Sequence, residues 1–155
     1  MPPTVRIREV VSGILYDTSG RLLLQQRDDK PTIPYPGEWT PFGGSVDPGE
    51  PPVYAVQREL MEELELDVPM TLWKKFVDPD RTIPGEIVCM HYSYRGLLDR
   101  DVKSLVQHEG QDRGMFTLDE LRDLTIAFMQ MPLLEEFVST QLEDRKSKRK
   151  RCIGK

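Results

Sequence analysis

The stretch from Gly43 to Leu66, GGSVDPGEPPVYAVQRELMEELEL, places a glycine-rich turn directly before a segment crowded with carboxylates. The apolar residues of its second half fall within about 80° of arc at 100° per residue: Val53, Val56, Leu60 and Leu64. This spacing predicts an amphipathic helix between Pro51 and Leu66 whose apolar stripe faces the core.

Three glutamates of the predicted helix, Glu59, Glu62 and Glu63, stand three and four positions apart, so their side chains share one face within about 100° of arc. Like charges at this spacing destabilise a helix by a few tenths of a kcal/mol per pair. A divalent cation removes the conflict, and carboxylate oxygens are ligands that Mg²⁺ prefers. The cluster therefore predicts a metal-binding face. The alternative is an acidic, solvated helix face, which is the usual meaning of a charge run.

The spacing of charged residues in this stretch resembles the Nudix box. Gly44 is followed by five residues, Glu50, seven residues and then Arg58-Glu59-Leu60-Met61-Glu62-Glu63, so every charged position of that signature is matched. Residues 39–44 and 117–121 are also similar to the family, and together the similarity covers most of residues 5–124. The chain is thus identified as a member of the Nudix (MutT-like) hydrolase family.

The resemblance implies a Nudix fold, a mixed β-sheet sandwiched between α-helices in the α/β (α+β) class. It also implies a hydrolase that uses Mg²⁺ or Mn²⁺ to cleave a diphosphate linkage in a nucleoside diphosphate derivative, of nucleotide or nucleotide-sugar type, by attack of water on phosphorus. The expected partner is therefore a small nucleotide-like substrate. Many family members are dimers, so a homodimer is also an expectation, whereas nucleic acid is not an expected partner.

The resemblance also assigns roles to residues by position. The implied metal ligands come from the turn and the helix: the carbonyl of Gly44 and the carboxylates of Glu59, Glu62 and Glu63. Arg58 would orient a carboxylate through charge-assisted hydrogen bonds, and Glu50 would support the turn or the outer metal shell. Family members differ in which carboxylate accepts the proton of water, so the candidates for general base are Glu59, Glu63 and Glu109.

Candidate residues outside the metal cluster carry weaker signals. Arg27 is a candidate to bind a substrate phosphate together with Gly43 and Gly44, although Arg27 also fits a turn after a strand. Glu109 lies in a loop-like segment where the family often places another carboxylate, but a solvated surface glutamate is the alternative. His91 and His108 are expected to be isolated, with structural or solvent roles. Tyr35 and Trp39 could stack on a base, although a Trp beside a sheet is more often core or rim.

Glu65 stands where the Nudix box normally has Gly. Glycine suits a left-handed helix end, a conformation that costs other residues roughly 1–2 kcal/mol. The helix either ends at Glu65 under this strain or runs slightly longer. Because Glu65 is not among the implied ligands, the expected effect is on stability and not on activity.

The remainder of the chain predicts mixed strands and helices, which suggests a sheet with helices packed on its faces. Strands are expected before and after a turn at residues 17–20, and again at 71–77 and 86–98, with an irregular loop at 28–38. Thr117 to Glu120 matches a capping box that opens a short helix to about Leu124. Pro132 is expected to open a last helix with five apolar residues on one side: Leu133, Leu134, Phe137, Val138 and Leu142.

Length and charge indicate one domain over residues 1–144 and a basic tail over residues 145–155. The tail holds seven of the 21 basic residues, and residues 1–144 carry 14 basic against 26 acidic residues, a net charge of −12. Such an acidic body repels a phosphorylated substrate unless cations intervene. The tail is expected to be a flexible solvated end, with contact to nucleic acid or an anionic surface as the alternative.

The start of the chain, MPPTVRIREV, lacks the apolar stretch of a signal peptide, and no apolar run approaches the ~20 residues that cross a bilayer. We therefore expect a cytoplasmic protein that has no contact with membranes. Only two cysteines, Cys89 and Cys152, are present, and both are expected to be free thiols.

Two other functions are alternatives to hydrolysis. An isomerase of the isopentenyl diphosphate type has a region similar to Leu22–Arg27 followed by a Trp, but its pattern expects a reactive Cys near the turn, where residues 40–43 supply none. A non-catalytic Nudix-fold module that only binds a ligand would not require the retained Glu62-Glu63 pair.

Overall fold

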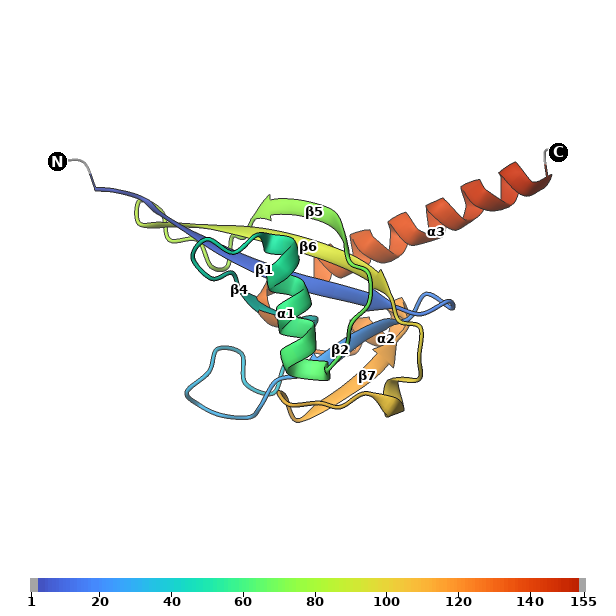
Figure 1. Cartoon of the computed structure of the whole chain (residues 1–155), viewed down its shortest axis with the longest axis horizontal. Helices are drawn as coiled ribbons and strands as arrows, with labels where there is room; N and C mark the ends of the chain where they lie inside the picture. The colour runs from blue at the N-terminus through green and yellow to red at the C-terminus, as the bar shows by residue number, and fades with distance from the viewer. Residues whose placement is uncertain (1–2, 154–155) are drawn as a thin grey trace.

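A mixed seven-stranded β-sheet carries helices on both faces (Figure 1), in a computed structural model that describes residues 3–153. Its elements are β1 (Arg6–Tyr16), β2 (Leu22–Gln26), β3 (Trp39–Thr40), β4 (Phe42–Ser45), α1 (Pro52–Leu64), β5 (Thr71–Val77), β6 (Ile87–Leu97), the 3₁₀ turn η1 (Val102–Ser104), β7 (Asp112–Phe116), α2 (Leu118–Arg122), the 3₁₀ turn η2 (Ala127–Met129) and α3 (Met131–Ile153). This arrangement confirms the predicted fold class.

Strand β1 organises the sheet, whose order is β3-β2-β1-β6-β5. It runs parallel to β6 along its whole length, from Arg6 opposite Ile87 to Tyr16 opposite Leu97. On its other edge it pairs with β4 over Val10 to Gly13 and with β2 only at Tyr16. The segment predicted as the glycine turn begins as a strand, because Gly43 and Gly44 lie in β4, and it is therefore fixed against the middle of β1, beside the gap between β4 and β2.

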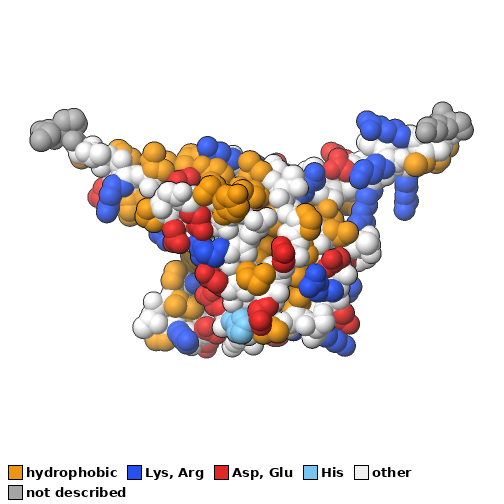
Figure 2. Space-filling view, in the orientation of Figure 1, with side chains coloured by type: hydrophobic (Ala, Val, Ile, Leu, Met, Phe, Trp, Pro, Cys, Tyr) orange, Lys and Arg blue, Asp and Glu red, His pale blue; other side chains and the backbone are white. Residues whose placement is uncertain are grey.

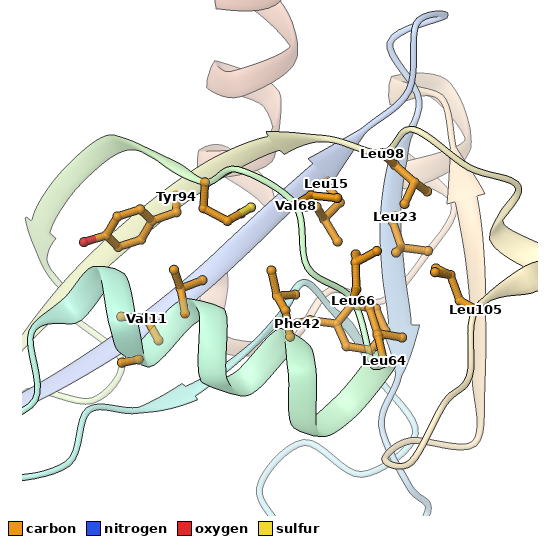
Figure 3. Close-up of a cluster of buried hydrophobic side chains, with 14 residues drawn as sticks. Val11, Leu15, Leu23, Phe42, Leu64, Leu66, Val68, Tyr94, Leu98 and Leu105 are labelled. Carbon is orange, nitrogen blue, oxygen red and sulfur yellow. The ribbon is translucent and has the colours of Figure 1, made fainter.

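Alternation along β1 and β2 separates two hydrophobic cores. On one face Leu15 and Leu23 pack beneath α1 in a cluster that Figure 3 shows. On the other face Ile14, Leu22 and Leu24 pack against α2 and the first turns of α3. The predicted apolar stripe of α1 is confirmed, since Val56, Leu60 and Leu64 are buried and Val53 packs partly against them.

Several predicted elements match the structure closely. The strand at 71–77 is confirmed at both ends, and the strand predicted at 86–98 is observed as Ile87–Leu97. The capping box is present, because the Thr117 hydroxyl accepts a hydrogen bond from the Glu120 backbone and the Glu120 carboxylate accepts one from the Thr117 backbone. Each of these elements was specified by local residue chemistry.

The last helix differs from its prediction in two ways. Leu142 was expected on the apolar side, but it is 50% exposed, because α3 buries no apolar side chain beyond Val138. Residues 145–153, where we expected a flexible end, continue the helix, which projects away from the sheet (Figure 1). Within residues 3–153, no helix has the length and apolar character needed to span a membrane.

Helix α1 ends at Leu64, so the expectation that it could run longer is wrong. Glu65 adopts the left-handed conformation with φ 51° and ψ 37°. Its backbone N–H donates to the carbonyl of Met61 at 3.0 Å, which closes the helix end. The Glu65 carboxylate and Nε2 of His108 lie 3.0 Å apart, so the expectation that His108 is isolated is also wrong.

We predict that Glu65→Gly stabilises the fold. The substitution removes left-handed backbone strain of about 1–2 kcal/mol. Two effects reduce this gain in stability: glycine has more conformational freedom in the unfolded chain, and the exposed contact with His108 is lost. Thermal unfolding should show a rise of roughly 2–4 °C. Glu65→Ala, which loses the same contact but keeps the strain, is the matched control, and an equal or higher melting temperature for that variant would contradict the explanation.

Candidate active site

Arg58 forms hydrogen bonds both to the loop after β4 and to other side chains of α1. Its Nε and Nη2 donate to the two carboxylate oxygens of Glu50 at 2.8 and 2.9 Å, and Nη2 also donates to the carbonyl of Ser45 at 3.0 Å. These hydrogen bonds lower the pKa of Glu50 to about 2. Nη1 donates to Glu59 at 3.0 Å and, more weakly, to Glu62 at 3.4 Å. One guanidinium thus joins the turn to the helix.

Gly44 allows the Glu59 carboxylate to lie directly against β4. A Cβ atom at this position would stand 2.6 Å from Cδ of Glu59, closer than real contacts allow. At Gly43 a Cβ atom would run into the backbone of Val11 on β1. Both positions therefore require glycine. Gly43 allows β4 to approach β1, and Gly44 allows β4 to approach the Glu59 side chain.

Glu63 is the most deeply buried carboxyl of the cluster, with 3% of the residue exposed. Burial, and then the neighbouring carboxylates of Glu109 and Glu59, raise the pKa of Glu63 to about 10. The loop that carries Glu109 is tied to the helix end, because the backbone N–H of His108 donates to the carbonyl of Glu63 at 2.8 Å. The structure thus brings together Glu59, Glu63 and Glu109.

The chemistry of this cluster fits a divalent cation. Oε2 of Glu63 is buried and has no hydrogen-bond partner in the described chain, and buried charges normally require a partner or a metal. Burial also raises the pKa of Glu59 despite the adjacent Arg58. Glu62 is more exposed, at 58% of its side chain. With Glu59 and Glu62 turned toward Arg58, however, no three His, Cys, Asp or Glu side chains within residues 3–153 are gathered tightly enough to ligate one ion.

A cavity of about 590 Å³ opens beside the cluster, in the gap between β4 and β2. Gly43, Gly44 and Glu109 form the wall that it shares with the carboxylates. Three arginines, Arg8, Arg27 and Arg81, also line it. In a chain whose first 144 residues carry a charge of −12, these cations create a local surface suited to an anionic ligand.

An aromatic wall, formed by Tyr35 and Phe128, closes another side of the cavity. The two rings meet edge to face at 4.8 Å between centroids. The guanidinium carbon of Arg81 lies 3.9 Å from the Phe128 centroid, and that of Arg27 lies 5.0 Å from it. Tyr35, Phe128 and the adjacent Met129 have φ values of 52°, 56° and 54°. Strained non-glycine backbone of this kind is typical of functional sites.

The cavity floor holds a buried polar network. Nε2 of His91 lies 2.8 Å from Oγ of Ser12, and Nδ1 lies 3.4 Å from Oδ2 of Asp78. The burial of Asp78 acts to raise its pKa, but the contact with His91 and the charge of Arg81 outweigh it and lower the pKa. His91 is also stacked on Phe76, so the expectation that this histidine is isolated is wrong.

The structure places the predicted site residues in two groups. Arg58, Glu59, Glu62 and Glu63 surround the glycine turn, while Gly43, Gly44, Arg27 and Glu109 line the cavity. Trp39 packs edge to face on Phe116 at 5.0 Å, as a sheet-side Trp was expected to do. Sequence reasoning missed the Asp80-Arg81 pair, whose Asp80 accepts a hydrogen bond from the Tyr35 hydroxyl at 2.6 Å. It also did not predict that Phe128 lines the cavity.

Comparisons with known proteins identify the class of this protein. A family model for the NUDIX domain matches residues 6–137. The chain therefore belongs to the Nudix family, and the expectation of a hydrolase that acts on phosphorus-containing anhydrides is confirmed.

Individual relatives extend this comparison. The chain is 29% identical over 139 residues to the CTP pyrophosphohydrolase of Escherichia coli K12, covering 87% of this chain and 94% of that protein. Nucleoside triphosphatase NudI of E. coli is 37% identical over 60 residues, 39% of this chain and 41% of that protein. Among solved structures, the E. coli ORF135 protein matches with a TM-score of 0.69 and 26% identity, covering 88% of this chain and 92% of that one. The MutT protein of Methanosarcina mazei Go1 matches with a TM-score of 0.70 and 19% identity, covering 93% and 97%.

We predict that Gly44→Ala disables the site while the fold is retained. The added methyl group displaces the Glu59 carboxylate, and a misplacement of about 1 Å can reduce turnover by roughly 100-fold. Turnover is measured as phosphate or pyrophosphate release, and folding by thermal unfolding. Ser45→Ala keeps the backbone carbonyl that Arg58 contacts and is the control. Full activity in Gly44→Ala would show that the approach of Glu59 to β4 is not required.

Proposed function

We propose that this protein is a Mg²⁺-dependent pyrophosphohydrolase that cleaves a diphosphate linkage in a nucleotide, with nucleoside triphosphates as the favoured substrates. One observation carries the proposal: the buried Glu63 carboxyl, with the half-buried Glu59 and the exposed Glu109 beside it, borders through Gly44 and Glu109 a cavity lined by arginines and aromatic rings. The similarity to a CTP pyrophosphohydrolase over 94% of that protein supports the same substrate class.

The metal would be held by Glu59, Glu62, Glu63 and the carbonyl of Gly44. When bound, Mg²⁺ supplies a lowered pKa for its water ligand and neutralises charge on the diphosphate. Within the protein, Arg58 orients Glu59 through the 3.0 Å hydrogen bond, and Glu50 holds Arg58 in turn. Of the three candidate bases, Glu109 is the one that lines the cavity, so we assign to Glu109 the acceptance of the proton from the attacking water.

The rest of the cavity suits the remainder of a nucleotide. Arg8, Arg27 and Arg81 can donate charge-assisted hydrogen bonds to phosphate oxygens. The half-buried Tyr35 ring and the Phe128 ring, 8% exposed, both line the cavity and can stack on a base there. Below them, the polar side chains of Gln25, Thr40 and Gln130 are 4–5% exposed and line the cavity. Such groups can hydrogen-bond the edge of a base.

Hydrolysis is preferred to the two alternatives. The isomerase type expects a cysteine near the turn, and Cys89, the nearer of the two cysteines in sequence, is buried within β6 and does not line the cavity. A module that only binds ligand would gain nothing from the carboxylates of Glu59 and Glu109 beside the buried Glu63, an arrangement that raises the pKa of Glu63 and costs stability without a cation. The cluster has a clear use only with metal and phosphate.

The proposal is tested with a panel of nucleoside triphosphates and nucleoside diphosphate sugars, each assayed with and without Mg²⁺. We expect a nucleoside triphosphate to yield the monophosphate and pyrophosphate, and EDTA to stop the reaction. Hydrolysis of nucleoside diphosphate sugars alone would make these sugars, and not nucleoside triphosphates, the substrate class. Undiminished turnover after removal of divalent metal would overturn the mechanism.

We predict that Glu63→Gln lowers kcat by at least roughly 1000-fold because the charged ligand is lost, while the melting temperature of the metal-free protein stays equal or rises. Without metal the raised pKa keeps Glu63 protonated, and a neutral amide removes the cost of that protonation. Glu65→Gln, two residues further along and outside the site, is the matched control for the change of acid to amide. Comparable kcat values in the two variants would remove Glu63 from the site.

We predict that Phe128→Ala raises KM about tenfold with a smaller change in kcat, since stacking on an aromatic ring contributes about 1–3 kcal/mol per base. Steady-state kinetics on the preferred nucleoside triphosphate measures both constants. Tyr54→Ala removes an exposed aromatic ring of α1 that does not line the cavity and serves as the control. An unchanged KM in Phe128→Ala would show that the base does not stack there.

A further inference from the structure

The face of α3 that packs on the body changes character along the helix. At 100° per residue, five of its side chains fall on one stripe about 80° wide: Leu134, Phe137, Gln141, Arg145 and Lys148. The first two are buried in the core. The stripe then continues with an amide and two cations on the side where packing would require apolar residues. The body-facing side of this helix is therefore built for polar contacts beyond Phe137.

A groove of about 440 Å³ lies beneath this polar half of the stripe. Its lining includes Gln141, Arg145 and Lys148 from α3 and Arg95 from β6. Arg95 stands opposite Ile14 near the end of the β1–β6 ladder, whereas the catalytic cavity is lined from β1 by Arg8, Val11 and Ser12. The groove is thus separate from the proposed active site.

Several hydrogen-bond donors that line the groove have no hydrogen-bond acceptor within the described residues. Nε2 of Gln141 is buried and has no hydrogen-bond partner among the described residues. Arg95 forms an ion pair at 3.8 Å with Asp144, the only carboxylate among the lining residues, and this distance is too long for a hydrogen bond. Lys148 makes no hydrogen bond or ion pair within residues 3–153. Only Arg145 is fixed, since its Nη2 donates to the carbonyl of Thr18 at 2.8 Å.

We propose that this groove is a binding site for a phosphate group, held by Arg95, Arg145, Lys148 and the amide of Gln141. Three cations face one carboxylate there, although residues 1–144 have a large excess of acid. Guanidinium and ammonium groups match the charge and geometry of a phosphate. The unpartnered amide supplies a further donor, whose burial costs free energy until an acceptor arrives.

The phosphate group can belong to a free small molecule or to a nucleic acid backbone. The projecting end of α3 beyond the groove is basic (Figure 2), with Lys146, Arg149, Lys150 and Arg151 all exposed. A polymer whose phosphate occupied the groove could therefore continue along this helix, while a free phosphate would use the groove alone.

The test is a titration of the metal-free full chain with inorganic phosphate, followed by ¹⁵N NMR. The backbone amides of Thr18 and Gly96 report on the groove, and those of Gly43 and Gly44 report separately on phosphate in the catalytic cavity. We expect saturable shifts at Thr18 and Gly96. In Arg145→Gln/Lys148→Gln the dissociation constant at these amides should rise at least roughly tenfold.

The matched control is Lys146→Gln/Lys150→Gln, which removes the same charge from the opposite side of α3 and should leave the phosphate affinity unchanged. The double variant also removes the contact between Arg145 and Thr18, which could fray the helix. The single variant Lys148→Gln keeps this contact and should still weaken phosphate binding. The proposal is overturned if Thr18 and Gly96 show no saturable shift, or if both double variants weaken binding equally.

A second titration with an oligoribonucleotide of about ten residues distinguishes the two sources of phosphate. Binding that is tighter than for inorganic phosphate, strongly dependent on salt and weakened by Lys146→Gln/Lys150→Gln assigns the groove to a nucleic acid backbone. An affinity no higher than that of inorganic phosphate assigns it to a small phosphorylated molecule. A polymer that binds without shifting Thr18 and Gly96 counts against the groove.

Discussion

The attachment of the glycine turn to α1 through Arg58 is the constraint on which the site depends. The guanidinium contacts Glu50 and the Ser45 carbonyl on one side and Glu59 on the other. A lysine could not replace these contacts, because its three donors sit on one compact nitrogen, whereas the guanidinium spreads five donors over a rigid planar fork. With the turn fixed, β4 lies against β1, and the bare backbone of Gly44 receives the Glu59 carboxylate. The contacts of Arg58 thus position both the carboxylate cluster and the cavity wall.

The cluster is a local conflict in an otherwise consistent structure. Arg58 satisfies the outer carboxylates, but it does not reach Glu63, whose buried Oε2 has no partner in the described chain. Two further carboxylates face Glu63 and disfavour its charged form. Sites that break the usual rules of burial and pairing in this way are expected where a protein has a function. The strained backbone at Tyr35, Phe128 and Met129 is a second conflict, on the opposite side of the same cavity.

Acidic and basic residues are distributed unevenly over the protein. The body is acidic overall, yet cations concentrate at the cavity and along α3. A generally acidic surface repels phosphates, while local arginines attract them where geometry permits. The same logic explains why the body-facing stripe of α3 changes from Leu134 and Phe137 to Arg145 and Lys148.

Elements with local signals could be predicted from the sequence: the apolar stripe of α1, the capping box at Thr117, and the spacing that led to Glu59, Glu62 and Glu63. Periodicity and capping act between residues a few positions apart, so a single chain segment contains the whole signal. Tertiary structure alone decided that Glu109 faces Glu63, that Tyr35 meets Phe128, and that His91 joins Ser12 and Asp78. These partners are 46, 93, 79 and 13 residues apart, and strand pairing, not local preference, brings them together. Left-handed backbone at Phe128 likewise has no signature in its residue type, because only the surrounding packing holds it there.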